Sequence, residues 1–245
     1  MDLFFELHLD LPREGPGDAA STRRAFSLMA GLPAQARLLD IGCGPGLQTI
    51  ELAQISSASI LALDNHQPFL DALARQAKQA GLADRISIRN QSMLALDFEP
   101  GSFDAIWSEG AIYIIGFEKG LREWQPFLKK GGYLAVSELS WLKPEPPLEA
   151  KTFWDENYPG MHTLEENLAI LQKTGYREIG HFTLPESAWW QDYYTPLEQR
   201  ITVLKEKYRV NPAAQAFLQD SQRETEMYRK YSEWYGYEFY VMQTQ

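Results

Sequence analysis

The chain has 245 residues, 44% of them hydrophobic, which is enough to bury the core of one large domain or of one domain with a cap. Acidic residues outnumber basic ones by 33 to 23, for a net charge of −10, which argues against a nucleic-acid partner because binding a phosphate backbone needs clustered Lys and Arg. With one cysteine and no run of about 18 apolar residues, the sequence predicts no disulfide framework, no metal site and no membrane partner.

The N-terminal segment, residues 1–33, has no basic region of the kind that opens a secretion signal, so a cytoplasmic location is expected. It begins with a largely apolar stretch, passes through the turn residues of 15–17, and is expected to continue as a helix over 18–30. Asp18 has the residue type and position of the N-cap of that helix.

A strand, a glycine loop and a helix are expected next. The apolar run 37–41 predicts a buried strand, and residues 47–53 predict the helix that follows the loop. The loop between them holds three glycines, Gly42, Gly44 and Gly46. Glycines permit a tight turn and a close approach of the backbone to a ligand. Open α/β sheets bind small molecules beyond the carboxyl ends of their strands, so a ligand is expected above this loop.

A dinucleotide-binding loop is the competing interpretation. The fingerprint G-x-G-x-x-G places a pyrophosphate at the N-terminus of the following helix. Its third glycine would occupy position 47, where this chain has Leu47. A nicotinamide-dinucleotide-binding protein is therefore a less favoured alternative.

Two further strands are expected over 59–64 and 85–89, separated by a helix over 68–80. The first ends in Asp64, 22 residues after the first loop glycine. This is close to the offset of about 20 residues at which an acid binds ribose hydroxyls in folds of this topology. The alternative is that Asp64 caps the helix that starts near His66.

The rest of the sheet is expected in the second half of the chain. A fourth strand over 103–108 is followed directly by Glu109, and residues 129–138 predict a turn into a fifth strand. The later elements are predicted to be a helix over 163–173, a strand over 176–184, helices over 196–208 and 212–231, and a strand over 237–243. The first of these helices begins with Thr163 and Glu166 in the pattern of a capping box.

Together these segments resemble the class I S-adenosylmethionine-dependent methyltransferases. Residues 40–46 have the pattern D-x-G-x-G-x-G of the family's first motif, and residues 128–134 have its L-x-x-G-G-x-L segment. The resemblance spans roughly residues 36–140. It implies an α/β fold with a Rossmann-like, doubly wound, seven-stranded sheet that is mainly parallel with an antiparallel last strand. It also implies an N-terminal lid helix and a helical cap inserted before that strand.

The resemblance implies S-adenosyl-L-methionine as cofactor and gives individual residues their roles. Asp64 would bind the ribose hydroxyls, with Asn65 beside the adenine. Many family members have Gly-Asp-Ala where this chain has residues 91–93, so the acid that binds the adenine amino group is replaced by Ser92. Met93 would pack on the purine, or is ordinary core. The expected cofactor-binding residues are Asp40, Gly42, Cys43, Gly44, Gly46, Asp64, Asn65, Ser92, Met93 and Glu109.

Two residues at the end of the fourth strand are expected to be catalytic. Glu109 would orient the cofactor or the acceptor, and Tyr113 would line the methyl-transfer site. The alternative is that Glu109 only satisfies local backbone N–H groups. None of the four histidines has a motif context that identifies it as a base.

Three parts of the chain are expected by this resemblance. Family members commonly fold a segment like 1–33 over the cofactor as a lid, and residues 15–17 would be its hinge. The alternative is that this segment forms a structural helix on the edge of the sheet. The core would comprise residues 34–185 and 235–245. The cap would be the insertion 186–234, with an aromatic loop over 189–194 leading into it.

Aromatic residues are dense near this cap, at positions 141, 154, 158, 189, 190, 193 and 194. They are expected either to form a pocket wall that holds an aromatic molecule or a cationic amine, or to attach the cap to the sheet. The favoured function is transfer of a methyl group to a small organic molecule. A non-catalytic S-adenosylmethionine-binding protein is the alternative from a different functional class.

Overall fold

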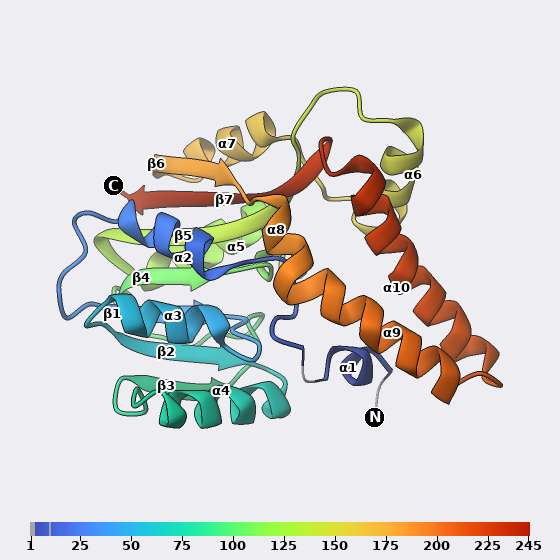
Figure 1. The fold of residues 1–245 in the computed structure, drawn as a ribbon. Helices are drawn as coiled ribbons and strands as arrows, with labels where there is room; N and C mark the ends of the chain where they lie inside the picture. The colour runs from blue at the N-terminus through green and yellow to red at the C-terminus, as the bar shows by residue number, and fades with distance from the viewer. Residues whose placement is uncertain (1–2, 10) are drawn as a thin grey trace.

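A single seven-stranded sheet organises the protein in the computed structural model, which describes residues 3–9 and 11–245 (Figure 1). The strand order is β3-β2-β1-β4-β5-β7-β6, and within the described residues β7 alone runs opposite to the other strands. The strands are β1 (Arg37–Ile41), β2 (Ser59–Asp64), β3 (Ile86–Asn90), β4 (Phe103–Ser108), β5 (Leu128–Trp141), β6 (Tyr176–Thr183) and β7 (Tyr235–Thr244). The predicted doubly wound fold is confirmed.

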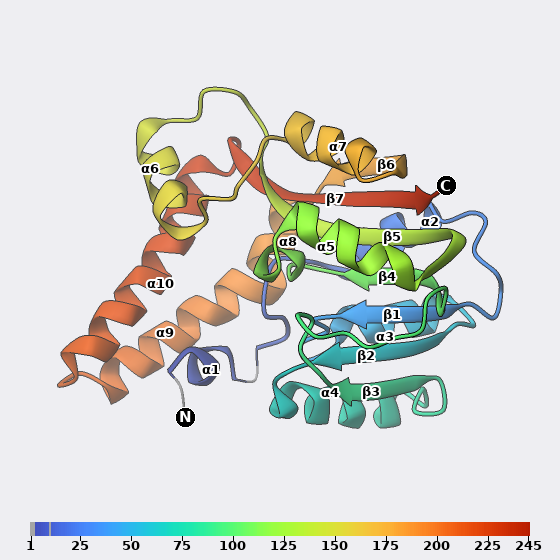
Figure 2. The ribbon, with the colours of Figure 1, turned by 180° about the vertical axis from the view of Figure 1, so that it is seen from behind.

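Helices cover both faces of the sheet. One face carries α2 (Ala19–Ser27), α3 (Leu47–Ile55) and α4 (Gln67–Gln79); the other carries α5 (Phe117–Trp124) and α7 (Leu164–Lys173) (Figures 1 and 2). Successive residues of β1 pack on opposite faces of the sheet. Leu38 belongs to the hydrophobic cluster that contains Leu52, and Leu39 belongs to the cluster that contains Leu121. Since both faces are covered, small molecules reach this sheet at the ends of its strands.

The N-terminal segment divides into two helices with different surroundings. Asp18 caps α2, as predicted, by accepting a hydrogen bond of 2.6 Å from the backbone N–H of Ser21. This helix packs beside α3 in the layer on the sheet, not above the strand ends where a lid helix was expected. The helix that precedes it, α1 (Leu3–His8), packs against α9 of the cap.

The cap lies beyond the carboxyl ends of the parallel strands (Figure 1). It is formed by α8 (Glu186–Trp189), the π-helical turn η3 (Trp190–Tyr194), α9 (Thr195–Lys207) and α10 (Pro212–Tyr231). The expected aromatic loop over 189–194 was wrong, because this stretch is helical and runs directly into α9. Trp189 and Tyr194 are buried against Tyr228 of α10, so tertiary packing overrides the modest helix propensity of aromatic residues.

A helix that the sequence analysis did not assign, α6 (Leu148–Asn157), completes this part of the molecule. Its Phe153 and Trp154 share one hydrophobic cluster with the cap helices, with Trp141 at the end of β5 and with Tyr235 at the start of β7. The predicted capping box of α7 is present, with Thr163 and Glu166 bonded reciprocally. No helix among the described residues is long and apolar enough to cross a membrane.

Candidate functional site

A cavity of about 300 Å³ lies where the carboxyl ends of β1, β2 and β4 meet; we call it the loop cavity. The predicted site residues that line it are Gly42, Cys43, Gly44, Asp64, Asn65, Ser92, Met93, Glu109 and Tyr113. Two predicted residues, Asp40 and Gly46, do not line it. The topology therefore gathers at one place most of the predicted residues, from the ends of four strands, β1, β2, β3 and β4.

The glycine loop has a shape that side chains would prevent. All three glycines have positive φ angles, of 72°, 53° and 89° along the chain. A Cβ atom on Gly42 would lie 2.6 Å from the Cβ of Ala111, and one on Gly46 would lie 2.4 Å from a methyl carbon of Leu73. The first glycine thus fits the loop to the end of β4, and the third seats α3 against α4.

Backbone N–H groups of the loop are bonded to the end of β2. Gly42 and Cys43 both donate to the carbonyl oxygen of Leu63, at 2.9 and 3.0 Å, and Gly44 donates to Oδ2 of Asp64 at 3.0 Å. A pyrophosphate would need free N–H groups in this position. These three amide N–H groups therefore bond within the protein, and the loop forms a rigid edge of the cavity.

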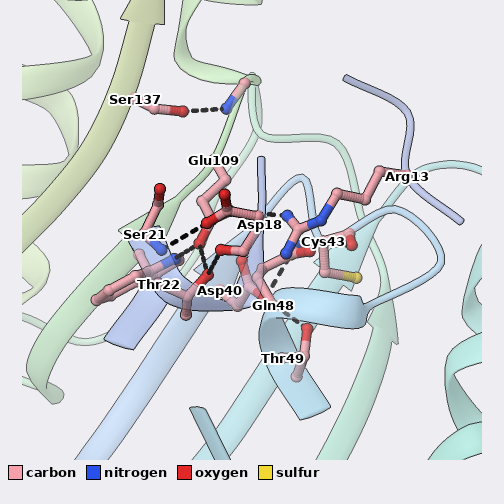
Figure 3. Close-up of polar contacts among 12 residues, drawn as sticks. Arg13, Asp18, Ser21, Thr22, Asp40, Cys43, Gln48, Thr49, Glu109 and Ser137 are labelled. Carbon is pink, nitrogen blue, oxygen red and sulfur yellow. Dashed lines mark hydrogen bonds and ion pairs between the residues drawn. The ribbon is translucent and has the colours of Figure 1, made fainter. Parts of the chain in front are cut away.

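Asp40 supports the loop from behind. It is fully buried, and its Oδ2 accepts hydrogen bonds from Thr49 Oγ1 at 2.5 Å and from Gln48 Nε2 at 3.4 Å (Figure 3). Gln48 also donates to the carbonyl oxygen of Cys43 at 2.8 Å, which ties the loop to the first turn of α3. Burial raises the pKa of Asp40 to about 7. Burial also raises the pKa of the Cys43 thiol.

Asp64 joins the loop to α4 and still faces the cavity. Its Oδ1 accepts a hydrogen bond of 2.9 Å from the backbone N–H of His66, in addition to the bond from Gly44. The N-cap of α4 is His66, so the alternative role of Asp64 as the cap of that helix was wrong. A carboxylate accepts about four hydrogen bonds, which leaves Asp64 capacity for two more.

The residues after β3 form the opposite wall. Ser92 Oγ accepts a bond of 3.2 Å from the N–H of Leu94, and Asn65 is exposed at the rim. Met93 both lines the cavity and packs against the core cluster below the sheet. Its packing against the core agrees with the second alternative, and contact with a purine stays a prediction.

Glu109 is held by the N-terminal segment (Figure 3). Its Oε2 accepts a bond of 2.8 Å from Arg13, and its Oε1 accepts bonds from Thr22 Oγ1 at 2.7 Å and Trp107 Nε1 at 2.9 Å. The side chains of Arg13 and Glu109 are only 6% and 4% exposed, so this is a buried ion pair. All three donors are side chains; the alternative in which Glu109 satisfies only local backbone groups was wrong.

Sequence reasoning missed Arg13 and Glu14. Glu14 lies over the loop, 3.3 Å from where a Cβ of Gly44 would be, and both of its carboxylate oxygens are buried without a hydrogen-bond partner. Burial, with a smaller contribution from the charge of Asp64, raises the pKa of Glu14 to about 8. The only signal in the sequence is an adjacent pair of opposite charges within a proline- and glycine-rich stretch, which is weak evidence for a site.

These residues fit the adenosyl cofactor that the sequence resemblance implies. The acid at the end of β2 retains acceptor capacity, and the glycine cradle is closed to any side chain larger than hydrogen. Glu14, whose carboxylate oxygens are buried without a partner, lines the same cavity. Among residues 3–9 and 11–245, no group of three or more His, Cys, Asp or Glu side chains is arranged to hold a metal ion.

Comparison with known proteins gives concordant matches. Residues 38–132 match the family described as "Methyltransferase domain". Sterol 24-C-methyltransferase erg-4 of Neurospora crassa is 25% identical over 200 residues, which are 76% of this chain and 52% of that protein. A sterol 24-C-methyltransferase of Clavispora lusitaniae is 32% identical over 103 residues, 42% of this chain and 28% of that protein. The chain thus spans about half, or less, of the length of these curated relatives.

Solved structures match over the whole fold. An S-adenosylmethionine-dependent methyltransferase of Geobacter sulfurreducens in complex with S-adenosyl-L-homocysteine has a TM-score of 0.86 at 18% identity, covering 100% of this chain and 98% of that one. A similar complex from Thiobacillus denitrificans has a TM-score of 0.85 at 19% identity, with 100% and 99% covered. At these identities the likeness establishes the fold alone.

Proposed function

Residues 38–132 form a methyltransferase domain of the class I, S-adenosylmethionine-dependent family, and from this premise we propose that the protein transfers a methyl group to a small organic molecule. The observation that carries the proposal is the loop cavity, where the glycine cradle and an acid with free acceptor capacity meet beyond the strand ends. A second cavity adjoins it and gives an acceptor a place to bind.

In this proposal the cofactor occupies the loop cavity. Asp64 binds the ribose hydroxyls, Asn65 and Ser92 lie beside the adenine, and Met93 packs on the ring. Gly42, Cys43 and Gly44 form the edge against which the cofactor rests. Asp40 and Gly46 act from outside the cavity, by fixing the loop on α3. S-adenosylmethionine supplies a methyl group already activated by the positive charge of its sulfonium.

Catalysis then depends chiefly on positioning, which contributes on the order of 7–11 kcal/mol when two reactants are well aligned. Tyr113 suits this role because it lines both cavities, and we propose that it borders the methyl-transfer site. For Glu109 we propose an orienting role exerted through Arg13, because its carboxylate already accepts three hydrogen bonds.

Calorimetric titration with S-adenosylmethionine, S-adenosylhomocysteine and NAD tests the proposed cofactor. We expect the first two to bind and NAD not to bind, because the loop amides are already bonded to the end of β2. Asp64→Asn should weaken binding of S-adenosylhomocysteine about tenfold or more, because the loss of a charged acceptor for two hydroxyls is worth about 1.5–3 kcal/mol.

The matched control is Asp71→Asn, an exposed acid on α4 outside the loop cavity, which should bind as the unmodified protein does. Release of S-adenosylhomocysteine from a metabolite mixture then separates an enzyme from a protein that only binds the cofactor. Tight binding of NAD alone, or equal effects of the two substitutions, would contradict the proposal.

A further inference from the structure

The second cavity, of about 350 Å³, lies between the sheet and the cap; we call it the cap cavity. It shares a wall with the loop cavity, formed by residues 14–16 together with Gly110 and Tyr113. A molecule in the cap cavity is therefore next to whatever occupies the loop cavity. The residues that line the cap cavity indicate the chemical class of such a molecule.

Aromatic rings form a large part of that lining. Trp154 and Tyr158 come from α6 and the residue after it, Trp189 and Tyr193 come from the start of the cap, and Phe217 comes from α10. Several are fixed by their own packing: Trp189 stacks on Tyr228 with ring centroids 3.9 Å apart, and Tyr193 is 8% exposed. Rigid aromatic faces attract cations because the face of the ring carries negative charge density.

Among the described residues, the lining contains three acids and, apart from His8, no basic side chain. Glu14, Asp220 and Glu224 line the cavity, whereas no Lys or Arg among the described residues does so. Glu224 accepts a hydrogen bond of 2.9 Å from Tyr194, and Glu14 has none. Burial lowers the pKa of His8, which disfavours its charged form.

Among the described residues that line the cavity, these acids have no Lys or Arg as a positively charged partner. Burial raises the pKa of Glu14 to about 8, and burial also raises that of Glu224, since each carboxylate is costly to ionise where it stands. An organic cation in the cavity would compensate both carboxylates and lie against the rings. A carboxylate or phosphate group would find no counter-charge there.

We propose that the cap cavity binds organic cations, namely amines protonated at neutral pH that carry an apolar or aromatic body. The inference rests on the proposed function, which makes this cavity the acceptor site, and narrows the acceptor to that class. Glu224 and Asp220 on α10 recognise the charge, and the aromatic walls hold the body.

The test uses the full chain saturated with S-adenosylhomocysteine, so that the loop cavity is filled. Calorimetry compares matched probes: 2-phenylethylamine, 2-phenylethanol and 3-phenylpropionate, and the corresponding naphthyl set. In each set we expect the ammonium member to bind about tenfold or more tightly than the neutral one, and the carboxylate to bind most weakly. Glu224→Gln and Asp220→Asn should each remove most of that preference.

Glu226→Gln is the matched control, because this exposed acid lies on the same helix and outside the cap cavity. Retained binding of S-adenosylhomocysteine shows that a variant is folded, and Asp220 is exposed, so its replacement is not expected to disturb packing. Ammonium probes that bind no more tightly than their neutral isosteres overturn the inference, as does a preference unchanged in both variants. If S-adenosylhomocysteine itself does not bind, the proposed function fails instead.

Discussion

Glu138 on β5 is a carboxyl group enclosed by the protein. It is 2% exposed, its Oε1 accepts a hydrogen bond of 2.6 Å from Tyr158, and its Oε2 has no partner. Burial raises the pKa of Glu138 from 4.5 to about 8, against a smaller opposing effect of the Tyr158 hydroxyl. The folded protein therefore holds a proton that the unfolded chain releases above about pH 4.5.

The first prediction concerns the pH dependence of stability. A raised pKa in the folded state stabilises the fold fully below the unfolded pKa of 4.5, and this contribution is lost as pH rises to about 8. In Glu138→Gln, which keeps an oxygen acceptor for Tyr158, that contribution is absent. The free energy of unfolding should fall less steeply between pH 5 and 8 than in the unmodified protein, by at most about 5 kcal/mol across the window.

Urea unfolding at several pH values measures this slope. Some slope should persist in the variant, because the pKa values of Asp40 and Glu14 are also raised, to about 7 and about 8. The exposed Glu226→Gln serves as control and should retain the full slope. Identical slopes in Glu138→Gln and the unmodified protein would show that Glu138 is already ionised in the fold.

At the scale of elements, the glycine loop places α3 on the sheet through two separable effects. Gly46 is the N-cap of α3 with φ of 89°, which strains any other residue, and a Cβ there would overlap Leu73 of α4. Gly101 has a similar φ of 67° with open space around its Cβ position. Comparing the two positions separates backbone strain from steric overlap.

The second prediction follows from that comparison. Gly101→Ala should lower the free energy of unfolding by about 1–2 kcal/mol, from strain alone. Gly46→Ala should cost about 1–3 kcal/mol more, because α4 must also move. In the double variant with Leu73→Ala, the part of the Gly46→Ala cost caused by overlap should disappear. If urea unfolding shows that the two substitutions lower the free energy of unfolding equally, Leu73 moves aside without a measurable energetic cost.

Local pattern was sufficient for much of the sheet and for some helix ends. β1, β2 and β4 begin and end at the predicted residues, because each is a short apolar run with a polar residue at its end. Two polar caps, at Asp18 and Thr163, were also correct, since capping depends on residues within one turn. The stretch 189–194 was assigned wrongly because its helical form depends on distant partners in α10.

The parts of the site that escaped prediction depend on long-range contacts. Glu109 is bonded to Arg13 and Thr22, which are 96 and 87 positions away in the sequence. No local pattern reports such pairs. The unpartnered carboxylate of Glu14 was equally hidden, because its environment is created only when the N-terminal segment crosses the strand ends.

At the scale of the whole molecule, the cap and the sheet share one core. The hydrophobic cluster of the cap includes Leu139 and Trp141 of β5, Tyr235 of β7 and Leu7 of α1. The boundaries 1–33, 186–234 and the remainder stay a prediction about how the sequence is organised. The parts themselves are not energetically independent, because they share this cluster and separating them would expose large aromatic side chains.

The third prediction is therefore that the cap and the sheet unfold together. Calorimetry should give one transition with equal calorimetric and van't Hoff enthalpies, and amides of α9 and α10 should exchange with solvent through the same global opening as those of β4. S-adenosylhomocysteine at about 100 times its Kd should stabilise the whole unit by about 2.7 kcal/mol. A separate early transition, or faster exchange confined to the cap, would show that the cap is an independent folding unit.

The wall between the two cavities has a thermodynamic consequence. Glu14, Gly15, Pro16 and Tyr113 touch both spaces, so a ligand that shifts this wall in one cavity alters the surface presented to the other. Any coupling energy is reciprocal: an acceptor that binds more tightly to the cofactor-loaded protein strengthens cofactor binding by the same factor. The affinities of the two ligands are therefore linked, and we expect a substitution in the shared wall to change both affinities.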